Sequence, residues 1–296
     1  MFRSSRVTPL DYEYLRKLLK DRSGLLLSSD KQYLIESRLL PLARKAGISG
    51  ISELVQKIKS GSEALTVDVV EAMTTNETFF FRDKVPFENV RDTVLPQLLK
   101  ARASRRSLRI WCAAASTGQE PYSLAMLLKE ALPPDWRAEI VATDLSLEVL
   151  EKAKAGIYSQ FEVQRGLPIQ LLVKHFKQVG DVWQLNPDIR AMVRYQQANL
   201  LQDFSHFGIF DIIFCRNVLI YFDQPTKIDV FGRMQKINEP DGFLFLGAAE
   251  TVIGLTDAYR ACPDLRGVYA PNPARVSSPS LVPGLGASQT KILARN

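Results

Sequence analysis

The sequence predicts an α/β protein with a doubly wound, mostly parallel sheet, preceded by a small helical domain. After residue 107, short apolar runs alternate with amphipathic segments, which is typical of strands joined by crossover helices. Before residue 75, apolar residues recur at spacings of three and four, which is typical of packed helices. With 296 residues, 46% of them hydrophobic, the chain can bury one large core and a smaller one.

The first expected domain covers residues 1–75. Four amphipathic segments follow one another in it: DYEYLRKLLK, DKQYLIESRLLPLARKAG, ISELVQKIKS and SEALTVDVVEAMTTN. None is apolar on all sides, so each helix is expected to bury one face against the others.

The second expected domain covers residues 76–270 and contains the sheet. Apolar runs predict strands at 108–112, 139–143, 210–215 and 243–247. Helices are expected to begin at Glu120, Ser146 and Gln224. In such a sheet, ligands bind at the carboxyl ends of the strands, near the point where the strand order reverses.

Two segments depart from this alternation. Residues 166–195 contain a helical LPIQLLVKHF, a turn at Gly180, and strand-like VWQLN and AMVRYQ, which predict a small antiparallel β insert. Residues 271–296 are rich in Pro, Ser and Gly with few large apolar side chains, so a disordered tail is expected there.

Composition narrows the class of protein. No apolar run approaches the roughly 18 residues that cross a bilayer, and the N-terminus lacks the apolar stretch of a signal peptide, so a cytoplasmic protein is expected. Cys112, Cys215 and Cys262 are far apart, which favours reduced thiols, and with only two histidines no metal is expected. The net charge of +6 suits an anionic partner without identifying it.

The segment WCAAASTGQEPYSLAMLL follows the first strand and opens a helix, so its small residues would let a ligand approach the helix start. It does not match GxGxxG. A nucleotide-like ligand without phosphates, such as S-adenosylmethionine, fits a loop with one Gly and several Ala. A plain strand-to-helix turn is the alternative.

Two acidic residues lie next to these strands. Asp144 ends the second strand, where an acidic residue commonly binds ribose hydroxyls, although it could instead cap the following helix. Glu120 lies in the first turn of a helix, where a carboxylate is favourable to the helix dipole even without a ligand.

Polar residues also lie in TTNETFFFRD, at the junction of the two domains, and in FDIIFCRNVLIYFD, on the third expected strand and its exit loop. Arg216, Asn217 and Tyr221 directly follow that strand, which places them at the functional end of the sheet. A surface salt bridge for Arg82 and a packed core ring for Tyr221 remain the structural alternatives.

Taken together, ETFFFR, AAASTGQEPYS, ATD, CRNVLIYF and DGFLFLGAAE, in this order and spacing, resemble the chemotaxis receptor methyltransferases, the CheR type. The resemblance spans roughly residues 10–272. It implies a Rossmann-like methyltransferase sheet and transfer of a methyl group from S-adenosylmethionine to glutamate side chains of chemoreceptors. It also implies that residues 1–75 face the receptor, where Lys31, Arg38, Arg44 and Lys45 lie.

Carried over residue by residue, the resemblance implies a catalytic pair, Arg82 and Tyr221. The implied cofactor-binding residues are Asn76, Thr78, Arg82, Glu120, Asp144, Asn199, Leu200, Arg216 and Asn217. The implied partner is the cytoplasmic helical domain of membrane chemoreceptors, with the enzyme recruited to receptor arrays as a monomer. The loop QVGDVW is shorter than in members that grip a C-terminal receptor tether, so tether-independent docking is expected.

Glutamate has an ordinary pKa near 4.3 and is ionised at pH 7, so its methylation needs alignment and no general base. The guanidinium of Arg82 could hold such a carboxylate by two hydrogen bonds.

Two other functions compete. A nucleic-acid methyltransferase would suit the positive charge, but such enzymes often carry a DPPY or NPPY loop where this chain has CRNVLIYF. A non-catalytic cofactor-binding module would not need Arg82 and Tyr221.

Overall fold

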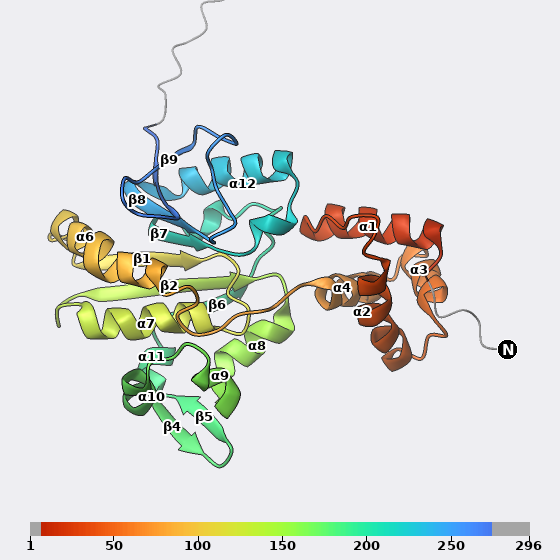
Figure 1. The fold of residues 1–296 in the computed structure, drawn as a ribbon, viewed down its shortest axis with the longest axis horizontal. Helices are drawn as coiled ribbons and strands as arrows, with labels where there is room; N and C mark the ends of the chain where they lie inside the picture. Colours follow the sequence, from red (N-terminus) through yellow and green to blue (C-terminus); the bar gives the residue numbers. More distant parts are fainter. Residues whose placement is uncertain (1–6, 274–296) are drawn as a thin grey trace, which may run out of the picture.

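The computed structural model describes residues 7–273, which form two lobes (Figure 1). The smaller lobe contains α1 (Pro9–Ser23), α2 (Gln32–Lys45), α3 (Ile51–Lys59) and α4 (Glu63–Met73). Leu15, Leu19, Ile35, Leu39 and Leu54 are fully buried between these helices. They come from the apolar faces expected from the sequence, so packing of amphipathic faces accounts for this lobe.

The end of α1 brings the chain against the larger lobe. The helix stops at Gly24, which adopts the left-handed conformation (φ 76°) and donates its N–H to Lys20 O. A Cβ at this position would lie 2.9 Å from the ring of Phe222. Glycine is therefore required by the backbone conformation and by the close approach of the two lobes.

The main sheet contains β1 (Ser107–Cys112), β2 (Arg137–Asp144), β6 (Val193–Gln197), β7 (Phe210–Cys215), β8 (Asn238–Leu246), β9 (Tyr259–Ala261) and β10 (Val268–Pro271). Their order is β6-β2-β1-β7-β8-β10-β9, parallel from β6 to β8 and antiparallel at β10. The direction of the order reverses between β1 and β7, which creates a switch point. The four expected strands and the doubly wound α/β sheet are thereby confirmed.

Helices cover both faces of this sheet. They are α5 (Val85–Asn89), a π-helical turn (Val90–Val94), α6 (Leu95–Ala101), α7 (Gln119–Ala131), α8 (Leu147–Ala155) and α12 (Gln224–Lys236). Alternate side chains of β1 serve opposite faces: Ile110 packs in the cluster that includes α7, and Trp111 packs in the cluster that includes α12. Figure 1 shows α7 and α12 on opposite sides of the strands.

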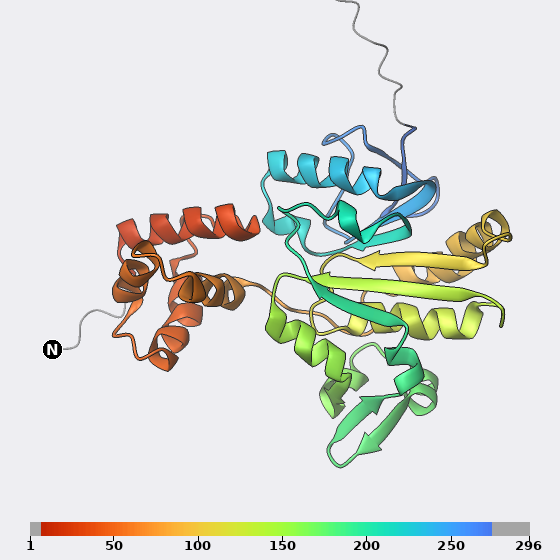
Figure 2. The same cartoon turned by 180° about the vertical axis from the view of Figure 1, so that it is seen from behind.

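An insert follows α8. It contains β3 (Ile157–Ser159), α9 (Gln160–Gln164), α10 (Ile169–His175), β4 (Phe176–Val179), β5 (Val182–Leu185) and α11 (Pro187–Arg190), with an antiparallel sheet of order β3-β5-β4. In both views it projects from the side of the main sheet that carries α7 and α8 (Figures 1 and 2).

The expected range of the insert, 166–195, is wrong at both ends. The small sheet also takes Ile157–Ser159, and the last expected strand of the insert is β6, which pairs in parallel with β2. A short strand reveals its alternation but not its distant partner, so its sheet could not be assigned from the sequence.

The C-terminal part of the main sheet was not predicted. β9 and β10 pair with each other, and β10 reaches Pro271, one residue into the segment expected to be a tail. The remainder of that expectation, from 274 onward, lies outside the described residues.

Within residues 7–273, no helix has the length and apolar character needed to cross a bilayer. Cys112 and Cys215 are buried, and all three thiols are free.

Candidate active site

A cavity opens at the carboxyl ends of β1, β2 and β7, the position that the switch point predicts. Its volume is about 960 Å³, including the solvent at its mouth. All ten residues expected at the site line it: Asn76, Thr78, Arg82, Glu120, Asp144, Asn199, Leu200, Arg216, Asn217 and Tyr221. The structure therefore brings the predicted residues together, while the role of each stays a prediction.

Asp144 lies at the end of β2 and is 8% exposed. Its Oδ2 accepts a hydrogen bond from Ser116 N (2.8 Å), and its Oδ1 accepts one from Ser146 N (3.1 Å). Burial raises the pKa of Asp144 although these N–H groups favour the charged form. The cap of α8 is Ser146, whose Oγ accepts from Val149 N. Asp144 is therefore not the helix cap and faces the cavity instead.

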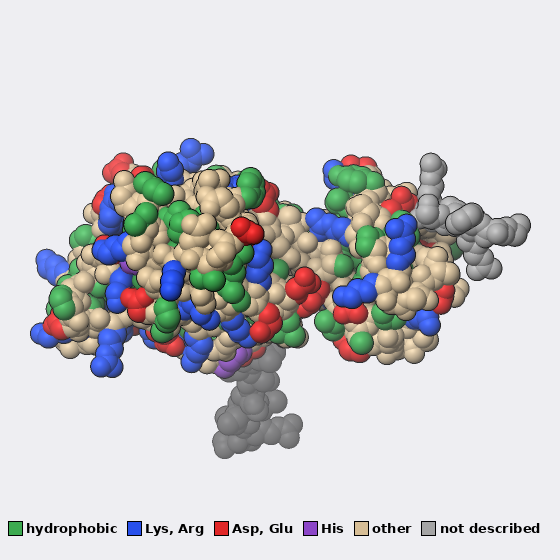
Figure 3. Space-filling view, turned by 90° about the horizontal axis from the view of Figure 1, so that it is seen from below, with side chains coloured by type: hydrophobic (Ala, Val, Ile, Leu, Met, Phe, Trp, Pro, Cys, Tyr) green, Lys and Arg blue, Asp and Glu red, His purple; other side chains and the backbone are tan. Residues whose placement is uncertain are grey.

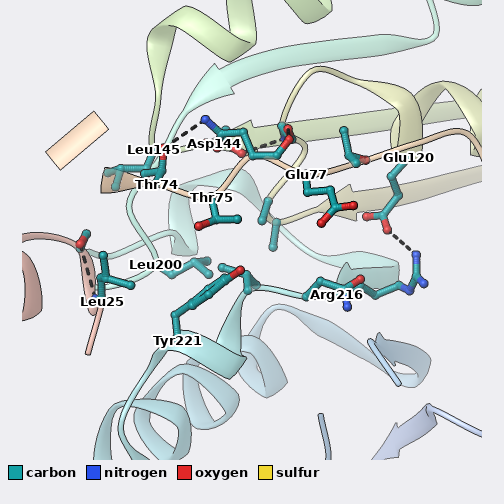
Figure 4. A pocket seen from close by; sticks show the side chains of 18 of the residues that line it. Leu25, Thr74, Thr75, Glu77, Glu120, Asp144, Leu145, Leu200, Arg216 and Tyr221 are labelled. Carbon is teal, nitrogen blue, oxygen red and sulfur yellow. Dashed lines mark hydrogen bonds and ion pairs between the residues drawn. The ribbon is translucent and has the colours of Figure 1, made fainter. Parts of the chain in front are cut away.

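Glu120 and Arg216 form a buried ion pair at one end of the cavity (Figure 4). Arg216 Nη1 donates to Glu120 Oε2 at 2.7 Å, and only 1% of the Arg216 side chain is exposed. Burial raises the pKa of Glu120, and the Arg216 charge opposes that shift. The family resemblance implies two separate cofactor contacts, and the structure pairs these two residues with each other.

Arg82 projects from the turn that follows the ETFFF segment. Its Nη1 donates to Glu77 O at 2.8 Å, and its guanidinium lies 5.7 Å from the centre of the Phe79 ring. Within residues 7–273, no carboxylate lies at ion-pair distance from Arg82. The surface salt bridge considered from the sequence is thus absent from the described part of the chain, and the guanidinium keeps donors for a ligand.

The segment between the lobes forms another wall. Asn76 Nδ2 donates to Thr74 Oγ1 (3.1 Å), and Ser116 Oγ donates to Asn76 O (2.8 Å). The second of these bonds ties the segment to the loop after β1. Thr78 is half-buried and lines the same wall.

Asn199 and Leu200 follow β6. Asn199 Nδ2 donates to Arg22 O (2.7 Å), while its Oδ1 accepts from Leu201 N (3.0 Å). Both ends of this amide are therefore used in holding the lobes and the loop together. Leu200 is 6% exposed and supplies an apolar wall with Leu145, suitable for a flat aromatic base.

Tyr221 ends a 3₁₀ turn, Leu219–Tyr221. Its ring is half-buried, packs against the core cluster that contains Leu219 and Phe222, and points into the cavity (Figure 4), so it is not a fully buried core ring. Tyr221 O accepts a hydrogen bond from Leu26 N at 2.8 Å. The smaller lobe thus holds the backbone of Tyr221, and its Ser23 and Leu25 line the same cavity.

Glu250 organises the loop that carries Asn217 and Tyr221. Its carboxylate accepts four backbone hydrogen bonds, from Gly247 N (2.7 Å), Asn217 N (2.8 Å), Val218 N (3.0 Å) and Ile220 N (3.2 Å). Asn217 has a positive φ of 59°, a conformation that asparagine tolerates better than most residues.

Sequence reasoning missed Glu250, Asp83 and the Ser23–Leu25 wall. Glu250 and Asp83 end the motifs DGFLFLGAAE and TTNETFFFRD, so proximity to recognised residues was a usable signal. No signal in the sequence indicated that the end of α1 reaches the sheet, because that contact depends on how the lobes pack.

The cavity fits S-adenosylmethionine. Ala113 and Ala114 directly follow β1 and have small side chains, which leaves room for a ligand close to the backbone. Arg216 Nε is buried and has no protein partner in the described part of the chain, so one donor remains for an anionic group. Asp144 offers a carboxylate for ribose hydroxyls.

Comparison with known proteins agrees with this geometry. Residues 10–74 match the CheR methyltransferase all-alpha domain, and residues 76–267 match the CheR methyltransferase SAM binding domain. The chain belongs to the CheR methyltransferase family. As a CheR methyltransferase, it is an S-adenosylmethionine-dependent methyltransferase of chemotaxis, which confirms the resemblance stated from the motifs.

Its relatives match over nearly their whole length. It is 44% identical to chemotaxis protein methyltransferase 1 of Pseudomonas aeruginosa over 256 residues, which are 84% of this chain and 93% of the relative. It is 43% identical to a chemotaxis protein methyltransferase of Pseudomonas putida, over 85% of this chain and 94% of that one. For chemotaxis protein methyltransferase 1 of Vibrio cholerae the identity is 40%, with 86% and 94% covered.

Proposed function

We propose that this protein is a protein-glutamate O-methyltransferase that esterifies glutamate side chains on the cytoplasmic helical domain of membrane chemoreceptors. The observation that carries the proposal is Arg82, a guanidinium with open donors on the wall of the cofactor cavity. A planar fork of this kind binds a carboxylate better than an amine or a base edge.

S-adenosylmethionine supplies a methyl group on a sulfonium, which a carboxylate oxygen can displace in line. The substrate glutamate is already ionised at pH 7, so no residue has to remove a proton. We assign to Arg82 the task of orienting that carboxylate and to Tyr221, which lines the same cavity, the task of orienting the reacting groups. Alignment of this kind can supply a large share of a barrier reduction.

The remaining predicted residues are proposed to hold the cofactor. Asp144 would accept from the ribose hydroxyls, and Leu200 would cover the base together with the backbone of Asn199. The other proposed contacts are Asn76, Thr78, Glu120, Arg216 and Asn217. For Glu120 and Arg216 the mutual ion pair indicates that part of their role is to shape the cavity.

The receptor-facing surface is proposed to lie on the smaller lobe. Arg44 and Lys45 are exposed at the end of α2, and Lys31 is half-buried near its start. The Arg38 guanidinium binds the backbone at the end of α4 and is less available to a receptor, because its Nη1 donates to Met73 O (2.7 Å) and Thr74 O (2.9 Å). In the view of Figure 3, basic and acidic side chains are interspersed over both lobes. Such a surface suits a locally acidic helix better than a continuous nucleic-acid backbone.

We further propose that docking does not need a C-terminal receptor tether, that the enzyme acts as a monomer, and that it works in the cytoplasm at receptor arrays. The two-residue turn between β4 and β5 supports the first point, since it leaves little loop to grip a peptide. Equal methylation rates for receptors with and without a C-terminal extension would agree with it, and a large fall on truncation would contradict it.

The direct test is transfer of labelled methyl from S-adenosylmethionine to membranes containing chemoreceptors. Carboxyl esters release methanol in base, so base-labile label on a receptor-sized band is the expected result. Cofactor binding without such label would overturn the glutamate assignment and indicate another acceptor or a non-catalytic role.

A further inference from the structure

The turn that carries Arg82 has an unusual backbone. Phe81, Asp83 and Lys84 all have positive φ values, 51°, 69° and 49°, and none of them is glycine. Residues other than glycine hold such conformations only when their surroundings enforce them, and such positions concentrate at functional sites. The contacts that enforce this turn therefore also decide where Arg82 points.

Two groups hold the turn from the sheet lobe. Ser123 Oγ accepts from Phe81 N at 2.9 Å, and Ser123 is fully buried. On the other side, Arg216 Nη2 donates to Arg82 O at 3.0 Å and to Asp83 Oδ2 at 2.6 Å. The contact between Arg216 and Asp83 joins a side chain that is 1% exposed to one that is 42% exposed.

Arg216 cannot easily move to follow the turn. Its other terminal nitrogen is paired with Glu120 at 2.7 Å, and the Glu120 side chain is only 10% exposed. The guanidinium is thus a fixed bridge from α7 to the turn, and charge-assisted hydrogen bonds of this kind are short and directional. Of the two carboxylates that Arg216 binds, Asp83 is the more exposed, at 42% against 10% for Glu120.

We propose that Asp83 is a positioning residue: its ion pair with buried Arg216 clamps the turn and so fixes the direction of Arg82 at the cavity wall. The inference rests on the proposed role of Arg82 in binding the substrate carboxylate. Part of the function of Arg216 is then to anchor this turn, in addition to any contact with the cofactor.

Aspartate at this position combines two separable properties. It tolerates a positive φ better than most residues, and it supplies a charged acceptor. Asparagine keeps the tolerance and one neutral acceptor, glycine keeps only the tolerance, and alanine keeps neither. A series of these three variants separates the ion pair from the backbone requirement.

The experiment uses the full chain and its Asp83→Asn, Asp83→Gly and Asp83→Ala variants. Glu88→Gln is the matched control, because it removes the same charge from an exposed position five residues further along. Turnover is measured with receptor-containing membranes at saturating S-adenosylmethionine. The dissociation constant of S-adenosylhomocysteine is measured by calorimetry, and the order of the Arg82 side chain by NMR of its Nε–Hε group.

If the ion pair positions Arg82, turnover falls roughly 100-fold in both the glycine and alanine variants, since a displacement of about 1 Å can cost that much. The asparagine variant loses no more than about tenfold. The Arg82 Nε–Hε signal broadens or shifts in the same order, S-adenosylhomocysteine binding changes less than about twofold, and Glu88→Gln behaves as wild type.

Two outcomes would overturn the proposal. Full activity and an unchanged Arg82 signal in the glycine variant, with loss only in the alanine variant, would show that aspartate serves the backbone conformation alone. Equal loss of S-adenosylhomocysteine affinity and turnover would show that Asp83 supports the cofactor cavity. If wild type methylates no glutamate, the proposed function fails by itself, and the Arg82 signal still decides the role of Asp83.

Discussion

Replacing Glu250 by glutamine should weaken the loop that holds Tyr221 without touching the cavity surface. The carboxylate receives four backbone N–H groups, from Gly247, Asn217, Val218 and Ile220, at 2.7 to 3.2 Å. Glutamine keeps one acceptor oxygen and turns an NH₂ group toward donors. A hydrogen bond to a charged group contributes about 1.5 to 3 kcal/mol, and unpaired donors add to its loss.

Because Glu250 is only half-buried, water can replace part of what is lost, so we expect a fall of about 2 to 3 kcal/mol in the free energy of unfolding. In a chain of 296 residues that lowers Tm by roughly 3 to 5 °C. We also expect turnover to fall by about tenfold or more, because Tyr221 and Asn217 lose their support. Calorimetric unfolding and the methyl transfer assay measure the two effects.

The control is Asp257→Asn, which removes one charge from an exposed position in the same C-terminal part of the chain. A second variant, Gly247→Ala, should disturb the same hydrogen bonds by steric overlap. Its Cβ would lie 2.8 Å from Glu250 Oε2 and 2.7 Å from Asn217 Nδ2. If Glu250→Gln matched Asp257→Asn in both Tm and turnover, the four hydrogen bonds would not support the loop as argued.

Three further changes test other parts of the site. Arg82→Lys should lower turnover by about tenfold or more at unchanged cofactor affinity, because charge remains while the fork is lost; a change in calorimetric affinity alone would contradict this role. Asp144→Asn should weaken cofactor binding. Its amide turns an NH₂ group toward the backbone N–H of Ser116 or Ser146 at any pH, so the effect of the raised pKa shows as a Tm difference from wild type that is more favourable at neutral pH than at low pH. Burial raises the pKa of Asp144 above 3.8, so its contribution to stability is most favourable at low pH and is lost as pH rises through the folded-state pKa. A Tm that fell at pH 7 and did not change at low pH would show the opposite sign. Gly24→Ala should cost roughly 1 to 2 kcal/mol, because φ is 76° and the new Cβ would meet Phe222 at 2.9 Å. Unchanged denaturant unfolding would refute the requirement for glycine there.

The strands of the main sheet were predictable because parallel strands covered on both faces become continuous apolar runs. LRIWC and FDIIFC are of this kind, and both lie where expected as β1 and β7. β6 was placed in the wrong sheet since VRYQQ is short and half polar, and its partner β2 lies about fifty residues earlier in the chain.

The site was predictable in its membership and not in its internal bonds. Arg216, Asn217 and Tyr221 could be placed at the functional end of the sheet because they directly follow an apolar strand. The bonds from Arg216 to Glu120 and Asp83 join three segments that are far apart in sequence. Which charges face each other across such distances depends on packing, and no local pattern encodes it.

The turn after α1 has a consequence for how such enzymes can be rebuilt or diversify. Leu26 holds the backbone of Tyr221, Arg22 O accepts from Asn199, and Ser23 and Leu25 line the cavity. The helical lobe therefore contributes residues to the wall of the cavity, and exchanging it would change that wall. A chimera that takes its receptor-facing helices from another member must keep Ser23–Leu26 native, or exchange them together with the loop that carries Tyr221. New receptor preferences are consequently easier to acquire by substitutions at exposed positions of α2 than by replacing the lobe as a unit.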